Sequence, residues 1–186
     1  MEFEEIQEII IQTLGTEVVL QAEPDITQPA LTIKTESIVE VCQLLRDHEQ
    51  TFFDMLSCLT GIDNGVEADT MEVIYHLYSI PFEHSLVLKV VVPRYTNEEK
   101  LPEVPSVSGV WLAANWLERD AYDLLGIVFK NHPDLRRILL PADWEGFPLR
   151  KDYKEQEKYH GMNVVYDRDQ YPSDTFLSEK QSDKDE

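Results

Sequence analysis

The residues best suited to chemistry gather between positions 118 and 134. Glu118, Asp120 and Asp123 stand close together, and His132 and Asp134 follow a few residues later. Carboxylates beside a histidine can act as general acid and base, so this set allows the hypothesis of a stand-alone acid–base enzyme that uses His132 with Asp134 or Glu118. Such catalysis needs two of these groups to converge on a pocket, which spacing along the chain does not establish.

Other kinds of site are not indicated. The sequence contains no glycine-rich phosphate loop, no G-x-S-x-G turn and no H-E-x-x-H motif. His76 and His84 fall on a predicted strand and in the next turn without a neighbouring cysteine, so we interpret them as surface or cross-strand residues rather than a zinc site. Cys42 and Cys58 are interpreted as core thiols in a reducing compartment. The sequence therefore predicts no metal site in this chain.

Charge sets one segment apart. Residues 1–110 carry a net charge of −15 and residues 152–186 a net charge of −5, whereas residues 111–151 carry six acids and six bases and all three tryptophans. The total of −20 argues against a nucleic-acid surface, which needs clustered lysine and arginine. A neutral segment rich in arginine and aromatic residues is typical of a protein contact surface. The opening MEFEEIQEII does not resemble a signal peptide, and no apolar run is long enough to span a bilayer.

The elements that must position these residues follow from hydrophobic periodicity. Apolar residues at helical spacing predict helices over 3–14 and 37–48, the second opened by a Ser37–Glu40 capping box. Short extended segments are predicted at 18–21 and 31–33, and an antiparallel meander at 52–60, 71–79 and 86–92, the first of these buried on both faces. Residues 96–108 are predicted to form a loop. This order predicts an α+β fold: a mixed or antiparallel sheet of about five strands, covered by helices, with an extended C-terminal arm.

A third helix is predicted over 110–125, capped by Ser106 or Ser108 and ended by Gly126. Along it, Arg119 can pair with Asp123, and Glu118 can reach Tyr122. Residues 127–129 are predicted to form a buried extended piece, and the prolines around 135–141 favour an extended run there as well. Adjacent arginines in an extended run point to opposite sides, so one of Arg136 and Arg137 is expected to hold the chain's own carboxylates while the other faces outward.

The domain organisation predicted from composition is a domain over 1–153 and an acidic arm over 154–186 that is partly disordered in isolation. Charge without aliphatic residues favours disorder for 178–186. The spaced aromatics of 154–177 favour a segment that orders on a neighbouring subunit.

Two strings in the neutral segment resemble the hallmark of one family. They are Glu-Arg-Asp-Ala-Tyr-Asp-Leu-Leu-Gly-Ile at 118–127 and His-Pro-Asp-Leu-Arg-Arg-Ile-Leu at 132–139, and Pro-Leu-Arg-Lys-Asp-Tyr at 148–153 matches the block that follows. The family is the C subunit of respiratory complex I, the proton-translocating NADH–quinone oxidoreductase. One departure is Asp120, where the family usually has glutamate, and the charge is kept.

The resemblance implies a non-catalytic structural subunit of the peripheral arm on the cytoplasmic side of the bacterial inner membrane. Its implied partners are the quinone-site subunit, the subunit with the last iron–sulfur cluster and other peripheral-arm subunits. Members carry no cofactor, while FMN and iron–sulfur clusters in other subunits pass electrons from NADH to quinone, coupled to proton translocation. An alternative within the same class is the homologous subunit of a membrane-bound hydrogenase-type complex.

The partner surface is predicted in the second half of the neutral segment, because the third helix is assigned to holding the domain together. The predicted interface residues are His132, Asp134, Arg136, Arg137, Trp144, Arg150, Lys151 and Tyr153. The residues predicted to form the structural motif that supports this surface are Glu118, Arg119, Asp123 and Gly126.

Overall fold

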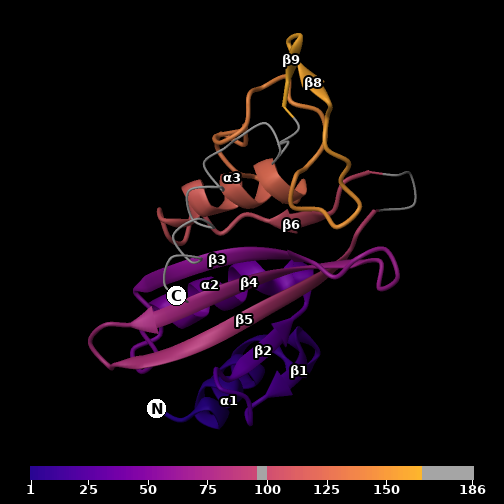
Figure 1. The fold of residues 1–186 in the computed structure, drawn as a ribbon. Coiled ribbons are helices and arrows are strands. Elements are labelled where there is room, and N and C mark those ends of the chain that lie inside the picture. The colour runs from indigo at the N-terminus through magenta and orange to yellow at the C-terminus, as the bar shows by residue number, and fades with distance from the viewer. Residues whose placement is uncertain (96–99, 165–186) are drawn as a thin grey trace, which may run out of the picture. The chain divides into compact units, whose positions relative to one another are not determined.

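The chain divides into two units, Met1–Tyr153 and Lys154–Glu186. A five-stranded mixed sheet lies at the centre of the first unit. The computed structural model describes residues 1–95 and 100–164. In spatial order the strands are β1 (Val19–Glu23), β2 (Ala30–Ile33), β5 (His84–Pro93), β4 (Thr70–Ser79) and β3 (Met55–Asp63). Strands β3, β4 and β5 form the predicted antiparallel meander, and β2 pairs with β5 in parallel (Figure 1). The mixed sheet confirms the predicted α+β class.

Helices pack on one face of this sheet. They are α1 (Phe3–Leu14), α2 (Ile38–Asp47) and α3 (Ala114–Leu125), with short 3-10 turns at η1 (Thr16–Val18) and η2 (Thr35–Ser37). The alternation of β4 decides which face they cover, since Met71, Val73, Tyr75 and Leu77 are all buried while the residues between them are half-buried. The apolar stripes of the three helices join these side chains in one core.

Strand β3 differs from its prediction, because only one face of it is covered. Its residues alternate between buried and exposed positions, with Leu56 buried and Met55 44% exposed. The reason is that the helices pack on only one face of the sheet, and an apolar run does not by itself show whether one or both faces of a strand are covered.

A second sheet has two strands, β6 (Glu103–Pro105) and β7 (Val128–Lys130), which pair in parallel. In the sequence, β6 precedes helix α3 and β7 follows it. The prediction of a loop over 96–108 is therefore wrong for residues 103–105, whose pairing partner lies on the far side of α3 in the sequence. Helix α3 itself approaches β3 closely at Gly61, where an added Cβ would lie 2.5 Å from a methyl carbon of Leu125. Glycine at this position lets the end of α3 contact the sheet.

Two predicted helix starts are also corrected. Helix α3 begins at Ala114, preceded by turns, and neither Ser106 nor Ser108 caps it. Ser37 makes no capping hydrogen bond at the start of α2, because the preceding 3-10 turn already gives it a helical backbone conformation. Gly126 does end α3 as predicted: its φ is 72°, and its N–H donates to Tyr122 O at 2.8 Å.

The described part of the second unit contains a small hairpin of β8 (Lys158–Tyr159) and β9 (Met162–Asn163). The predictions for residues 165–186 lie outside the described residues. Across 1–95 and 100–164, no helix combines the length and apolar character needed to cross a membrane.

Candidate partner interface

Asp123, on the inner face of α3, organises the segment that follows the helix. Its Oδ2 accepts hydrogen bonds from the backbone N–H groups of Ile138, Leu139 and Leu140 at 3.0, 2.7 and 2.9 Å. Burial alone would raise the pKa of the Asp123 carboxyl, but these donors and Arg137 outweigh it and hold that pKa below its usual value. Three consecutive N–H groups around one carboxylate fix the path of the chain after α3.

The two neighbouring arginines have opposite roles, as the extended run predicts. Arg137 Nη1 donates to Asp123 Oδ1 at 2.9 Å and to Asp123 O at 3.1 Å, and its Nη2 donates to Gly146 O. Arg136 points outward with its side chain 72% exposed, 3.0 Å from the carboxylate of Asp134, which is also accessible. Arg137 therefore builds the segment, and Arg136 is the arginine that a partner can reach.

The side-chain pairs predicted along α3, Arg119 with Asp123 and Glu118 with Tyr122, are replaced by other contacts. Arg119 donates instead to Arg136 O at 3.2 Å, and its guanidinium lies 5.0 Å from the ring centre of Trp116, which is 65% exposed. Asp123 is occupied by the segment after the helix. Helical spacing makes an i, i+4 ion pair feasible, but an exposed ion pair on a helix contributes little to stability. The hydrogen bonds from backbone N–H groups to the buried carboxylate of Asp123 are stronger than such a pair.

Glu118 is fully buried beneath the loop that precedes α3. Its Oε1 accepts the N–H of Val107 at 2.7 Å, and its Oε2 accepts the hydroxyl of Ser106 at 2.6 Å. Burial raises the pKa of Glu118 to about 7, despite the opposing effect of these two donors. The carboxyl therefore anchors the loop, and its ionisation falls near neutral pH.

The imidazole of His132 is also inside the domain, with its side chain 0% exposed. Its Nδ1 accepts the N–H of Asp134 at 3.0 Å, so the ring proton resides on Nε2, which donates to Asn115 O at 3.0 Å. Glu118 Oε2 lies 4.0 Å from Nε2. Both histidine nitrogens thus hold the turn after β7 against α3, and the ring is closed to solvent.

Arg150 fixes the second half of the neutral segment in a similar way. Its Nε donates to Leu125 O, a carbonyl at the C-terminus of α3, at 2.7 Å. Its guanidinium lies 4.9 Å from the ring centres of both Tyr95 and Phe147 and bonds to the Tyr95 hydroxyl. A cation that lies at a helix C-terminus and close to two aromatic rings is a stabilising arrangement.

A further cluster, which sequence reasoning missed, joins the ends of β3 and β5 to this segment. Arg94 binds both oxygens of Asp63 at 2.8 Å, and both side chains are at most 2% exposed. Asp63 also accepts the N–H of Lys151 at 2.8 Å, and Arg94 also pairs with Asp152. Burial tends to raise the pKa of Asp63, but Arg94 and the backbone donors lower it overall. The only signal in the sequence was that Asp63 and Arg94, which carry opposite charges, each come shortly after a predicted strand.

The structure therefore divides the predicted interface residues into two groups. Arg136, Asp134 and Lys151 expose their side chains, and Trp144 and Tyr153 are half-buried and joined by a 3.1 Å hydrogen bond. His132, Arg137 and Arg150 turn inward and support the surface from below. That this surface contacts a partner stays a prediction.

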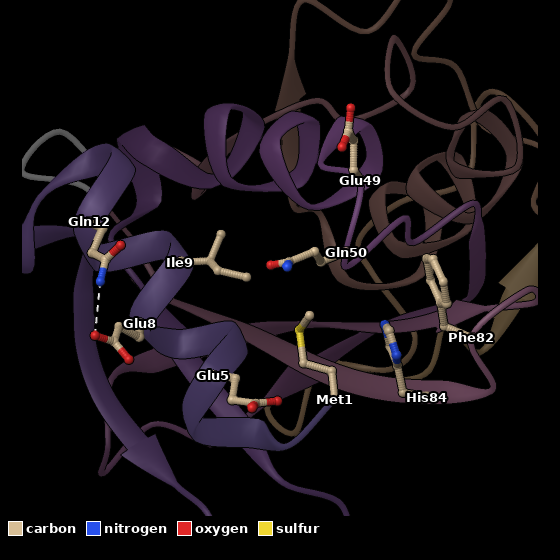
Figure 2. Close-up of a pocket in the computed structure, with 9 residues that line it drawn as sticks. All are labelled: Met1, Glu5, Glu8, Ile9, Gln12, Glu49, Gln50, Phe82 and His84. Carbon is tan, nitrogen blue, oxygen red and sulfur yellow. Dashed lines mark hydrogen bonds between the residues drawn. The ribbon is translucent and has the colours of Figure 1, made fainter.

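An acidic cleft of about 750 Å³ lies elsewhere in the first unit, between α1, the turn after α2 and the β4–β5 hairpin. Figure 2 shows Glu5, Glu8 and Gln12 on α1, with Phe82 and His84 on the hairpin. Acidic lining alone does not define a ligand, and no cluster of three histidine, cysteine or acidic side chains within the described ranges could hold a metal ion. His76 and His84 belong to no such cluster.

Comparison with known proteins decides the family. The sequence model of the family described as "Respiratory-chain NADH dehydrogenase, 30 Kd subunit" matches residues 31–159, which include both charged motifs. This chain belongs to that family. The match begins at β2 and covers the site from Asp63 to Tyr153.

Curated relatives in the 30 Kd subunit family share this segment at high identity. A Chlorobium phaeobacteroides protein, named as the C subunit of NADH-quinone oxidoreductase, is 44% identical over 135 residues, which is 72% of this chain and 78% of that protein. The protein of the same name from Geobacter metallireducens is 46% identical over 136 residues, 70% of this chain and 80% of its own. Both names describe a subunit of a larger enzyme.

Relatives differ in length, and one solved structure shares the fold. The NADH-quinone oxidoreductase C subunit of Chloroherpeton thalassium is 47% identical over 123 residues, which is 66% of this chain but only 48% of that relative, so this chain spans about half of its length. A chain of the membrane-bound sulfane sulfur reductase, an archaeal respiratory membrane complex, has a TM-score of 0.67 over 90% of this chain and 97% of its own. At 19% identity, this likeness establishes the fold alone.

Proposed function

We propose that this chain is the C subunit of a proton-translocating NADH–quinone oxidoreductase and that it serves the complex as a structural subunit. The complex passes electrons from NADH through FMN and iron–sulfur clusters to quinone, and those groups are carried by other subunits. Our proposal places the chain in the peripheral arm, on the cytoplasmic side of the inner membrane. The quinone-site subunit and the subunit with the last iron–sulfur cluster are the proposed neighbours.

The observation that carries this proposal is how the chain uses its charged motifs. Glu118, Asp123 and the His132 side chain are 0% exposed, and each bonds to backbone groups of the same unit. Such bonds shape a surface and leave these groups no access to a substrate. The burial of His132 therefore argues against the stand-alone acid–base enzyme, because its imidazole would have to meet a substrate.

Among complexes of this class, the curated relatives favour the NADH–quinone oxidoreductase. They are 42–47% identical to this chain and carry that name. The hydrogenase-type alternative is therefore less well supported than the NADH-dependent complex.

The deciding experiment is purification of the tagged chain from its native membrane extract, with the partners identified by mass. We expect the quinone-site and iron–sulfur subunits to co-purify with it, together with NADH–quinone reductase activity. Recovery of the chain alone, or with the subunits of a hydrogenase-type complex, would overturn the proposal. Truncation after Tyr153 tests the arm separately, since normal incorporation of the truncated chain would exclude a role for 154–186 in docking.

A further inference from the structure

An apolar groove of about 550 Å³ lies between two segments that are far apart in the sequence. One wall is the turn from α2 into β3, and the other is the turn that precedes α3. Three large apolar side chains on these walls are well exposed: Phe52 by 43%, Met55 by 44% and Leu112 by 88%. Leu56 and Trp111, which also line the groove, are almost completely buried. Exposed apolar side chains around a buried apolar base are typical of a protein-binding surface.

The two walls are tied to each other. The indole N–H of Trp111 donates to Phe53 O at 3.0 Å, and Arg46 Nη1 donates to Val110 O at 2.9 Å. Both bonds link the α2–β3 region to the turn before α3. The groove is therefore a preformed feature of the unit, so a ligand does not need to order it on binding.

Phe52 is held on the groove wall at a conformational cost. Its φ is +34°, in a region that bulky side chains rarely occupy. Its N–H donates to His48 O at 3.0 Å and its carbonyl oxygen accepts the N–H of Asp54 at 2.9 Å, and these two bonds maintain the conformation. This backbone conformation costs about 1–3 kcal/mol and leaves the ring of Phe52 exposed to water, which does not stabilise the unit. The cost therefore indicates that the exposed ring has a function.

Charge indicates what the groove would accept. The guanidinium of Arg46 is paired with Asp47 and contributes no free positive charge. The carboxylate of Asp54 accepts the N–H of Ile80 at 2.9 Å, and no cation lies within ion-pair distance of it in the part of the chain that the structure describes. The groove therefore offers apolar walls with one uncompensated negative charge at its edge.

We propose that this groove binds a large apolar side chain of a neighbouring protein subunit, and that a lysine or arginine next to it in that subunit pairs with Asp54. The inference rests on the proposed function, since the neighbour is a subunit of the same complex. It adds a docking point formed by Phe52, Met55, Asp54 and Leu112, all outside the predicted interface between His132 and Tyr153.

Photo-crosslinking in the assembled complex tests the occupant. A photoreactive phenylalanine analogue replaces Leu112, and in the control it replaces Leu20, which is 62% exposed in β1. We expect the Leu112 probe alone to crosslink to another subunit, in a peptide with a basic residue beside an apolar one. Crosslinking to a second copy of this chain, to lipid, to nothing, or equally from both positions would overturn the proposal.

Substitutions test the energetic role of the groove. Leu112→Glu and Met55→Glu are expected to lower incorporation into the complex by about tenfold, because each places a charge against an apolar partner. Leu20→Glu is the matched control and is expected to incorporate normally. Asp54→Asn keeps an acceptor for Ile80 N–H, and its expected effect is a weaker complex whose stability depends less on salt.

The failure of this proposal can be told from the failure of the proposed function. All four variants change exposed side chains, and unchanged thermal unfolding of each isolated chain verifies that it folds. If the wild-type chain is absent from the complex, the proposed function fails. If it is present but Leu112→Glu and Met55→Glu incorporate at the wild-type level, only the groove proposal fails.

Discussion

Arg137 donates to both the carboxylate and the backbone carbonyl oxygen of Asp123, so one guanidinium closes the segment after α3 against the helix. The same carboxylate holds three consecutive N–H groups. We predict that Asp123→Asn lowers the free energy of unfolding by about 3 kcal/mol, because it leaves buried donors and a cation without their anion. Denaturant unfolding measures this loss, and hydrogen exchange should quicken at 138–140.

The control for Asp123 is Glu67→Gln in the β3–β4 turn, an exposed carboxyl on which no backbone donors converge within the described residues. It should change stability by less than about 0.5 kcal/mol. Because the folded state lowers the pKa of Asp123, its contribution is present above the pKa of the unfolded chain and is lost as pH falls through the folded value. The destabilisation caused by Asp123→Asn should therefore shrink in acid, and a constant difference at all pH values would contradict this account.

Glu118→Gln should change how stability depends on pH. Burial raises the pKa of Glu118 from 4.5 to about 7, so the contribution of this carboxyl to stability is greatest below pH 4.5 and is lost as pH rises to 7. Glutamine keeps an acceptor for Val107 N–H without this titration. We expect the variant to gain about 3 kcal/mol relative to the wild type between about pH 4.5 and pH 7.5. Parallel stability curves for the two proteins would show that Glu118 does not titrate in this range.

Arg94→Gln should destabilise the unit strongly. It leaves the carboxylate of Asp63, which is 1% exposed, without its cation, and the expected loss is about 3–5 kcal/mol. Proteolysis near Lys151 should also accelerate, because Arg94 and Asp63 together hold 151–152. Lys130→Gln is the control: its pair with Glu103 is about half exposed, so its loss should cost less than about 1 kcal/mol. Equal losses in the two variants would contradict the role of the Arg94 cluster.

Alanine substitutions of the two adjacent arginines should cause defects in different assays. Arg137→Ala removes internal hydrogen bonds and should lower the thermal stability of the isolated chain as well as its incorporation into the complex. Arg136→Ala removes an exposed pair, so it should leave stability within about 0.5 kcal/mol and lower assembly or quinone-reductase activity through a lost charge-assisted contact. Normal assembly of Arg136→Ala would show that this arginine does not face the partner.

Local patterns predicted the elements well. The 3.6-residue period placed the helix at 3–14, alternation placed β4 and β5, and the glycine at 126 placed the end of α3. Each of these signals is read from neighbours along the chain. The opposite directions of Arg136 and Arg137 also followed from local geometry, since extended residues alternate.

The long-range bonds were not predictable from spacing. Arg94 meets Asp63 across 31 residues and Asp152 across 58, and no periodicity connects them. Residue types do not show which backbone N–H groups will meet a carboxylate, so the partners of Asp123 and Glu118 were assigned to nearby side chains instead. Strand β6 was missed for a related reason, because a three-residue strand is defined by its distant partner β7.

The parallel pairing of β2 with β5 bears on how the chain folds. The meander from β3 to β5 closes only short loops, whereas β2 must find β5 across the whole of α2, β3 and β4. Closing the longer loop costs more chain entropy before any contact compensates for it. We therefore expect the meander to form early and residues 19–33 to join it late, so that the edge of β5 is transiently open to other chains during synthesis of the protein.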